Sequence, residues 1–350
     1  MTHVRGWCLI GLLTLATACS SSSSSTPTTP TTPTTPTTPG GATTTVTLTD
    51  AITGAAVSGA TLTATGLSAA ASSASGTMVI SGTGSDTVHI VTMKASGYVD
   101  RSVYLKVPGA AVAVTMIPSS LNLSAFDEML RVTRLQRWTS APPLRVQTQT
   151  MQFTSVNQAE GVAIDDAMTT GERESLEADL AWALPQLTGN QFQAFASVTR
   201  ESMASGERMQ VLNSGVITVG RYAGLTAGSG YWGYSRWQFR TDGTVISGTI
   251  MLDRDFDRST SRFVRSLRSH ELGHALGYTH VTLETSVMNS VATTEPNTFD
   301  RNVTRIAFQR PPGNVRPDVD PSSFSLNAIG PAVWSVGAGA GPHGHRHTPR

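Results

Sequence analysis

Cysteine is scarce in this chain, which has 350 residues and only Cys8 and Cys19 as cysteines. Both lie close to the N-terminus. No disulfide can therefore cross-link the rest of the sequence, and no thiolate is available there as a metal ligand. We expect the folded part to depend on its own hydrophobic core, which places it outside the class of small disulfide-stabilised domains.

Charge and long apolar runs are also in short supply. Charged residues make up 14% of the chain and the net charge at pH 7 is +1, which argues against a nucleic-acid-binding protein. The apolar run at residues 9–15 is too short to span a bilayer stably, and no other segment is long and apolar enough to do so. The length leaves room for one small module and one domain of roughly 200 residues.

The N-terminus has the pattern of an export signal. Arg5 precedes the apolar run, and Ala16-Thr17-Ala18-Cys19 follows it. Small residues before a cysteine resemble a bacterial lipobox, which implies removal of residues 1–18 and a lipid on Cys19. We expect an exported protein that is lipid-anchored to the cell envelope, periplasmic or at the cell surface, with simple secretion as the alternative. Residues 19–45 are Ser-rich and then Thr-Pro-rich, which predicts an extended stalk.

A small module follows the predicted stalk. Residues 46–118 alternate Val, Thr and Ala with frequent glycine, which predicts the short strands of an all-β sandwich. The segments 50–54, 57–60 and 95–98 resemble carboxypeptidase regulatory-like domains. This resemblance implies a transthyretin-type sandwich that acts as a spacer or a binding surface, with His89 as an ordinary strand residue.

The eleven residues His-Glu-Leu-Gly-His-Ala-Leu-Gly-Tyr-Thr-His at 270–280 carry the strongest chemical signal. His270 and His274 are four residues apart, so on a helix their imidazoles leave the same face and can bind one ion. Gly277 can end the helix in the left-handed conformation. The chain then reverses, so that His280 can supply a third nitrogen and leave a fourth position to water.

Three histidine ligands beside a carboxylate are suited to metal-assisted hydrolysis. Zn²⁺ would lower the pKa of its bound water towards about 7 and polarise the scissile carbonyl. Glu271, as general base, would take the proton from the attacking water and deliver it to the departing amine. No other histidine occurs between residues 119 and 332, which disfavours a chance cluster.

The extended motif resembles the metzincin zinc metalloproteases, and Met288, eight residues after His280, resembles their Met-turn. The resemblance implies an α+β domain over residues 119–332, with a twisted mixed sheet, a long zinc helix and Zn²⁺-dependent endopeptidase activity. The short distance to Met288 is most similar to the matrixins, although the cysteine-switch propeptide of that group is excluded. Val281 and Ser290 depart from subfamily patterns, so the subfamily stays open.

Periodicity predicts the elements around the motif. We expect strands at 144–148, 216–222 and 244–252, and helices at 172–187 and 300–308. Thr169 and Glu172 should cap the first of these helices. The strand at 244–252 directly precedes the zinc helix, where metzincins have the edge strand that pairs with substrate.

The zinc helix should begin near Ser259 or Ser261, either of which can act as N-cap. Its arginines are expected on a solvated face; they are Arg262, Arg265 and Arg268. The aromatic stretch with Trp232, Tyr234 and Trp237 is expected to pack in the core or sheet.

Two function classes remain. The first is a monomeric endopeptidase that acts on protein or peptide substrates, or on cell-wall peptides by the same chemistry. The alternative is a surface binding or adhesion lipoprotein whose metal site is structural or vestigial. Residues 119–140 are either a prosegment over the cleft or the first helix of the domain. Residues 333–350, with alternating histidines at 343, 345 and 347, are expected to be a disordered tail.

Overall fold

The computed structural model describes three stretches of the chain and one further strand. These are residues 43–82, 87–155 and 161–322, and the backbone of residues 332–339. The expected signal peptide, Cys19 and the stalk up to residue 42 lie outside the described residues. No helix in the described ranges is both long and apolar enough to cross a lipid bilayer.

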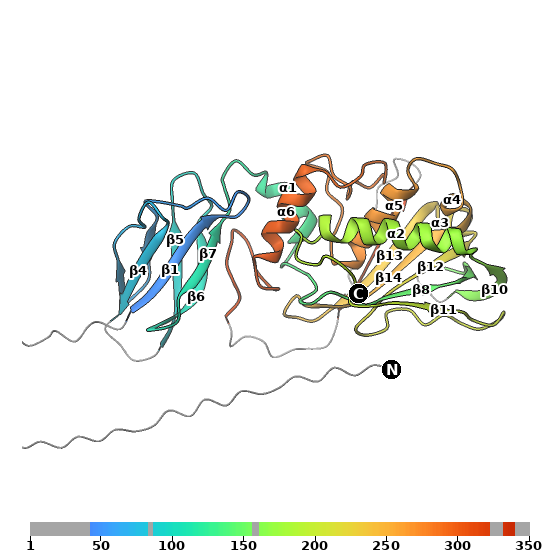
Figure 1. The fold of residues 1–350 in the computed structure, drawn as a ribbon, viewed down its shortest axis with the longest axis horizontal. Coiled ribbons are helices and arrows are strands. Elements are labelled where there is room, and N and C mark those ends of the chain that lie inside the picture. Colours follow the sequence, from blue (N-terminus) through green and yellow to red (C-terminus); the bar gives the residue numbers. More distant parts are fainter. Residues whose placement is uncertain (1–42, 83–86, 156–160, 323–331, 340–350) are drawn as a thin grey trace, which may run out of the picture. The chain divides into compact units, whose positions relative to one another are not determined.

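Every described residue belongs to one compact unit within Gly41–Arg350. Its strands are gathered in three sheets, and its helices lie mainly beside the largest of them (Figure 1). This arrangement confirms the α+β class that the sequence predicts.

Seven strands over residues 43–116 form two sheets, with the orders β3-β4-β1-β7 and β2-β5-β6. In the first sheet β1 runs parallel to β7 and antiparallel to β4. In the second, β5 is antiparallel to both of its neighbours. The bounds are β1 (Thr43–Asp50), β2 (Thr61–Thr63), β3 (Leu67–Ala69), β4 (Thr77–Gly82), β5 (Thr87–Lys94), β6 (Arg101–Val107) and β7 (Val112–Met116).

Both sheets contribute to one core, because alternate residues of each strand point inward. In β1, Val46 and Leu48 are buried while Thr47 is exposed. Ile80 of β4 and Leu105 of β6 belong to the same core. The first strand begins at residue 43, three residues before the sequence places the start of the module.

The largest sheet is mixed. Its strands follow the order β10-β9-β12-β14-β13-β15, and β8 pairs with β11 and β12. β12 runs parallel to β8, β9 and β14, whereas β13 is antiparallel to β14 and β15. The bounds are β8 (Leu144–Gln147), β9 (Gln149–Gln152), β10 (Val162–Ala167), β11 (Val198–Glu201), β12 (Ile217–Ala223), β13 (Tyr231–Phe239), β14 (Val245–Asp253) and β15 (Ala332–Gly339).

The strands predicted at 144–148, 216–222 and 244–252 are confirmed to within one residue at each end. The placement of the last one at the sheet edge is wrong, because β14 has β12 on one side and β13 on the other. Strand β13 is not predicted from the sequence. Its inward positions include a glycine and a serine, so the strand lacks a regular alternation of apolar and polar residues.

Six helices occur in the described residues. Helix α5 packs on β13 and β14 and against α2, and α2 also contacts α6. Leu176 and Leu180 of α2 and Val303 of α6 lie in the main core with Leu267 of α5. The bounds are α1 (Leu123–Leu130), α2 (Thr170–Gln186), α3 (Leu225–Ser229), α4 (Arg254–Asp257), α5 (Val264–Ala275) and α6 (Thr298–Phe308).

The capping box predicted for α2 is confirmed: the Thr169 hydroxyl accepts from the Glu172 backbone N–H, and the Glu172 carboxylate accepts from that of Thr169. The predicted start of the zinc helix is wrong. Helix α5 begins at Val264 without a side-chain cap: Ser259 donates to the Phe256 carbonyl after α4, and the Ser261 hydroxyl accepts from the Phe263 N–H in the turn before the helix.

The expected solvated arginine face of α5 is wrong for Arg268. This side chain is buried and lies 2.7 Å from Asp257 and 2.8 Å from Asp179, while Arg262 and Arg265 are exposed. A buried guanidinium between two carboxylates is paired rather than solvated. Arg268 therefore fixes α5 to α2 and to the turn after β14.

The tail expected to be disordered from residue 333 contains a strand. Residues 332–339 form β15, antiparallel to β13. The composition rich in Gly, Ala and Val, which suggested disorder, is compatible with pairing once an unpaired neighbouring edge is present. Residues 340–350, with their three histidines, lie outside the described residues.

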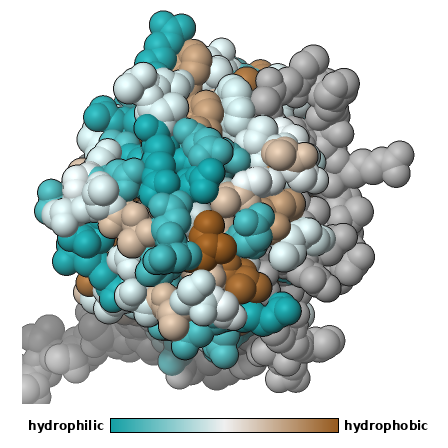
Figure 2. Space-filling model, turned by 90° about the vertical axis from the view of Figure 1, so that its right-hand side faces the viewer, coloured by the Kyte–Doolittle hydropathy of each residue, from teal (hydrophilic) through white to brown (hydrophobic). Residues whose placement is uncertain are grey.

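Figure 2 shows the face that lies to the right in Figure 1, near α3, α4 and β10. This face is mostly hydrophilic, with scattered weakly apolar residues and one small patch of strongly apolar surface, drawn in brown. A patch of this kind is normal for a protein surface and does not indicate a docking face.

Candidate metal centre

The second half of α5 places two of the predicted ligands in the interior. His270 and His274 are fully buried on the side of the helix that faces the sheet, and the His274 ring is stacked parallel to that of Trp237, with 6.0 Å between centroids. Trp237 is itself fully buried and donates from its ring nitrogen to Gln136. The predicted core packing of Trp237 is therefore confirmed.

The turn after α5 brings the third histidine back. Gly277 has φ +107°, and a Cβ at this position would lie 2.8 Å from the Val245 side chain. A residue with a side chain would be both strained and obstructed there. The reversal lets His280, which is 6% exposed, join the other two rings.

The three rings converge through the same atom. The Nε2 atoms of His270 and His274 are 2.9 Å apart, and those of His274 and His280 are 3.2 Å apart. The third distance, between His280 and His270, is 3.3 Å. Among the described residues these side chains form the one group of histidine, cysteine or acidic residues whose ligand atoms converge closely enough for a metal ion.

Hydrogen bonds determine which nitrogen of two of the rings carries the proton. His270 Nδ1 lies 2.7 Å from the Val287 carbonyl, and His274 Nδ1 lies 2.7 Å from the Tyr278 carbonyl. A carbonyl can only accept, so each Nδ1 must donate. In the neutral imidazole Nε2 then presents a lone pair, which is the form that binds a metal.

Two such lone pairs at 2.9 Å repel one another unless a cation lies between them. A tetrahedral ion with nitrogen ligands at 2.0–2.1 Å requires N···N distances of about 3.3 Å. The observed distances of 2.9, 3.2 and 3.3 Å are close to this requirement. The residues present thus fit a small tetrahedral ion with one position left for another ligand.

The carboxylate next to the first ligand is held by the sheet. Glu271 is fully buried, and the hydroxyl of Ser235 on β13 donates to its Oε2 at 2.6 Å. The neighbouring inward position of β13 is Gly233, where a Cβ would lie 2.4 Å from Glu271 Oε1. Strand β13 therefore makes room for the carboxylate with a glycine and orients it with a serine.

The segment around Met288 lies under the helix. The side chain of Met288 is fully buried, and its sulfur would lie 2.3 Å from a Cβ placed on Gly273. The Val281 N–H donates to the Met288 carbonyl, and the Asn289 side-chain amide donates to that of Val281. These bonds tie the residues after the third histidine to the turn that contains Met288.

Helix α6 supports the same turn. Asp300 is fully buried, and its carboxylate accepts from the Ser286 hydroxyl and from the backbone N–H of Val287. Burial raises the pKa of this carboxyl, and the hydrogen bonds oppose that shift. Because the Val287 carbonyl accepts the hydrogen bond from His270 Nδ1, Asp300 helps to position a candidate metal ligand through one residue.

Helix α1 holds the other side of the turn. The Glu128 carboxylate accepts from the backbone N–H groups of Thr282 and Leu283 and from the Thr282 hydroxyl. Phe126 and Met129 of this helix belong to the main core. Residues 119–140, for which the sequence allowed either a prosegment or a first helix, thus contain a core helix. This helix holds the loop after His280 by hydrogen bonds.

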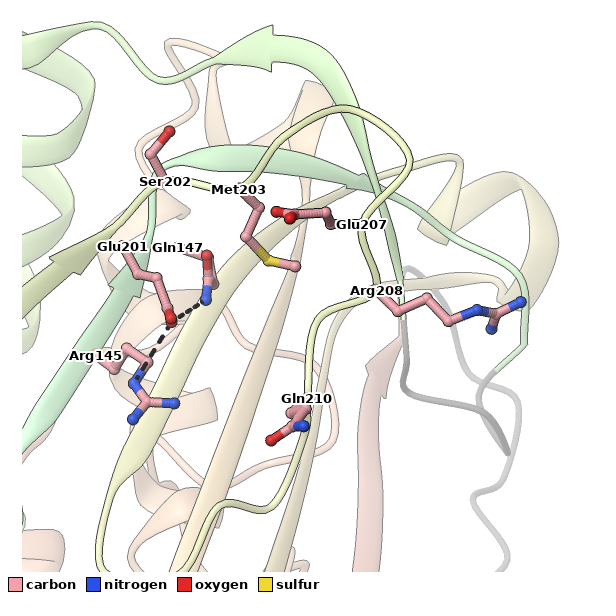
Figure 3. A pocket seen from close by; sticks show the side chains of 8 residues that line it. All are labelled: Arg145, Gln147, Glu201, Ser202, Met203, Glu207, Arg208 and Gln210. Atoms are coloured by element: carbon pink, nitrogen blue, oxygen red, sulfur yellow. Dashed lines mark hydrogen bonds and ion pairs between the residues drawn. The ribbon is translucent and has the colours of Figure 1, made fainter.

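A separate hollow lies away from the metal centre. It has a volume of about 500 Å³ and lies beside β8, β11 and the loop that follows β11. Glu201, one of the residues that line it, lies 2.6 Å from the Gln147 amide nitrogen and 3.6 Å from Arg145 (Figure 3). None of the residues that line this hollow is part of the histidine cluster.

The residues that support the cluster were not found in the sequence analysis. Ser235, Asp300 and Glu128 come from three elements that lie 36 residues before, 29 residues after and 143 residues before Glu271 in the chain. No local spacing marks them. A search against family models and a search of curated proteins found no match to this chain.

Proposed function

We propose that this chain is a zinc-dependent endopeptidase of metzincin type. The observation that supports the proposal most directly is the convergence of three imidazole Nε2 atoms beside a buried carboxylate on the adjacent residue. His270, His274 and His280 would hold the ion. Three neutral nitrogen ligands at this spacing suit zinc, and the fourth position distinguishes a catalytic site from a closed structural one.

When bound, the zinc ion supplies a Lewis acid that polarises a carbonyl and acidifies water. Glu271 then has the role of general base. It takes a proton from the attacking water and returns it to the departing amine. Ser235 donates to one carboxylate oxygen and so keeps the carboxylate in a fixed direction beside the histidines.

The buried positions of the ligands also favour this chemistry. Glu271 and two of the three histidines have no exposed surface, and electrostatic interactions are stronger where bulk water is excluded. A metal site kept only for structure would have no use for a carboxylate that is buried and oriented beside it. This argument favours the endopeptidase over the surface binding lipoprotein.

Replacing Glu271 by glutamine tests the mechanism. We expect Glu271→Gln to lower turnover of a quenched peptide library or casein by roughly 100-fold or more, because the general base is lost. Zinc content, measured by atomic absorption after dialysis, should stay equal to that of the parent protein. A chelator should abolish the parent activity, and added zinc should restore it.

The matched control is Glu174→Gln, the same change on the exposed face of α2, which should leave turnover unchanged. Retained activity in Glu271→Gln would contradict the proposed mechanism. Zinc binding without turnover of any protein, peptide or cell-wall peptide would favour the surface binding lipoprotein instead.

A further inference from the structure

The sheet edge beside the metal centre belongs to β13. Its Ser235 donates to the Glu271 carboxylate, and its Gly233 lies against the same side chain. The inner edge of β13 is paired with β14. Its outer edge, at these same residues, is therefore the backbone along which an extended chain would pass the metal centre.

Strand β15 occupies that outer edge. The pairing is antiparallel and covers β13 from end to end, with Gly233 opposite Ala338 and Ser235 opposite Val336. Strand β15 also contacts α5, the helix that carries the metal ligands. The C-terminal part of the chain thus lies in extended form beside Glu271.

An edge strand can pair with only one further strand. Extended peptides commonly bind to proteins by adding a strand to an exposed sheet edge, with main-chain hydrogen bonds that do not depend on sequence. A peptide substrate that aligns on β13 next to the metal centre would need the backbone groups that β15 already uses. Binding of such a peptide and pairing of β15 are mutually exclusive.

We propose that residues 332–339 are an autoinhibitory strand: they occupy the substrate edge of the metal centre in cis, and the enzyme becomes active when this strand is displaced or removed. The proposal rests on the endopeptidase function proposed above. It commits to an extended peptide as the competing partner.

The composition of the strand suits a reversible blocker. Its sequence Ala-Val-Trp-Ser-Val-Gly-Ala-Gly carries no charge, and two of its eight residues are glycine, which pairs weakly in strands. Attachment to the same chain compensates for weak pairing, because a short tether gives an effective concentration of the order of millimolar.

The kinetic consequence follows from the closed fraction. If the strand is closed in roughly nine molecules of ten, the apparent KM for a peptide substrate is raised about tenfold and kcat is unchanged. Substrate at high concentration or cleavage of the tail would relieve the block.

A cross-strand disulfide in the full chain tests the pairing directly. The structure places Arg236 opposite Ser335, and the described residues contain no cysteine. In a background with Cys8 and Cys19 replaced by serine, we expect Arg236→Cys with Ser335→Cys to form a disulfide on mild oxidation. Facing residues in a sheet have Cβ atoms about 4.5–5.5 Å apart, close to the range a disulfide spans.

The matched control combines Arg236→Cys with Ala332→Cys, which moves the second cysteine three residues along β15 and to its opposite face. Mass spectrometry should show efficient cross-linking of the facing pair only. The oxidised facing pair should lose at least nine-tenths of its peptidase activity, and dithiothreitol should restore it. Equal cross-linking of both pairs, or full activity of the oxidised protein, would overturn the proposal.

Truncation after residue 322 provides the second measurement. We expect a KM about tenfold lower with kcat unchanged, and a synthetic peptide of residues 332–339 should inhibit the truncated protein competitively. If KM does not fall and the peptide does not inhibit, the strand is only structural. If the truncated protein has zinc but no turnover while the facing disulfide forms, the endopeptidase function fails and the pairing of β15 stands alone.

Discussion

Main-chain carbonyls orient the ligands of the candidate metal centre. The carbonyls of Val287 and Tyr278 accept hydrogen bonds from Nδ1–H of His270 and His274, so each ring presents Nε2 to the shared position. Partners of this kind fix the tautomer and direction of a metal-binding histidine. The centre therefore depends on the fold of the loop after α5 as much as on the histidines themselves.

Ser235 is the side chain whose removal tests this orientation at the general base. We expect Ser235→Ala to lower kcat by roughly tenfold, because a hydrogen bond to a charged group is worth about 1.5–3 kcal/mol and keeps Glu271 in one direction. KM and zinc content should be unchanged. Steady-state kinetics of the purified variant measure kcat and KM, and metal analysis measures the zinc content.

Ser247→Ala is the matched control for this change. Ser247 is also fully buried, on the next strand, but its hydroxyl donates to Gln238 rather than to the metal centre. Both variants should lose similar thermal stability. If kcat falls equally in both, Ser235 has only a structural role.

The ligands and their supports differ in how far they can be predicted. His270, His274 and His280 lie within eleven residues, so helix periodicity and one turn are sufficient to bring them together. Ser235 meets Glu271 only because β13 folds back along β14 in one register. A register shift of one residue would point Ser235 away from the helix.

At the scale of elements, α5 and the turn containing Met288 are packed without spare room. Helices usually gain about 0.5–1 kcal/mol when an interior glycine becomes alanine. Gly273 should not follow this rule, because its Cβ would lie 2.3 Å from the buried Met288 sulfur. Gly273 lies between His270 and His274 in the sequence, and its lack of a side chain lets the turn that contains Met288 pack close to these two histidines.

We expect Gly273→Ala to lower the free energy of unfolding by about 1–3 kcal/mol, the usual cost of overpacking a core. Zinc affinity should fall with it, since the displaced turn carries the Val287 carbonyl. Urea unfolding and competition with a chromogenic zinc chelator measure the two effects.

The control is Gly171→Ala in α2, where an added Cβ meets nothing within 4 Å; stability should be unchanged or slightly increased. Equal behaviour of the two variants would contradict close packing at Met288.

The elements themselves were predicted unevenly. Helix α2, with its capping box, and the strands β8, β12 and β14 follow local patterns; the strands were predicted to within one residue and the helix to within two. Strand β13 was missed because its inward residues include Gly233 and Ser235, which the neighbouring Glu271 requires. The sequence instead placed β14 at the sheet edge, although β14 lies between β12 and β13. The residues that contact Glu271 are thus the ones that interrupt the apolar pattern by which a strand is identified.

On the scale of the whole molecule, a buried ionic cluster connects the two halves of the described chain. The Asp318 carboxylate lies 2.7 Å from Arg310, whose guanidinium also donates to the Thr115 carbonyl in β7. Asn314 donates to the same carboxylate. Ala51 and Ile117 of the first module belong to the main core. The sandwich and the part that contains the candidate metal centre therefore share a compact unit.

Asp318 should make the stability of this unit sensitive to acid. Burial favours the neutral form, but Arg310 and its hydrogen bonds outweigh burial and hold the pKa of the Asp318 carboxyl below its ordinary value near 3.8. A lowered folded pKa means that the unfolded chain binds the proton first. The stabilisation is fully present above about pH 4 and is lost as the pH falls through the folded pKa.

We expect Asp318→Asn to cost roughly 3–5 kcal/mol of unfolding free energy at pH 7, because it leaves Arg310 buried without its charge partner. The variant should also lose less stability than the parent between pH 5 and pH 2.5. Urea unfolding from pH 7 to pH 2.5 measures the loss of unfolding free energy and its dependence on pH.

Asp100→Asn, in the half-exposed pair with Lys94, is the control and should change stability by less than about 1 kcal/mol. If the unfolding free energies of the parent and Asp318→Asn fall equally with decreasing pH, Asp318 is not the source of the acid sensitivity.

The sequence by itself determined the cluster of three histidines, the neighbouring carboxylate of Glu271, the α+β class and most of the helices and strands. Each of these depends on residues that are close in the chain, where helix and strand periodicity is a sufficient guide. The tertiary structure alone decided which strand lies beside the centre, which residues orient the base and the ligands, and where the C-terminal segment pairs. These depend on sheet register and on contacts between residues far apart in the chain, for which local periodicity carries no information.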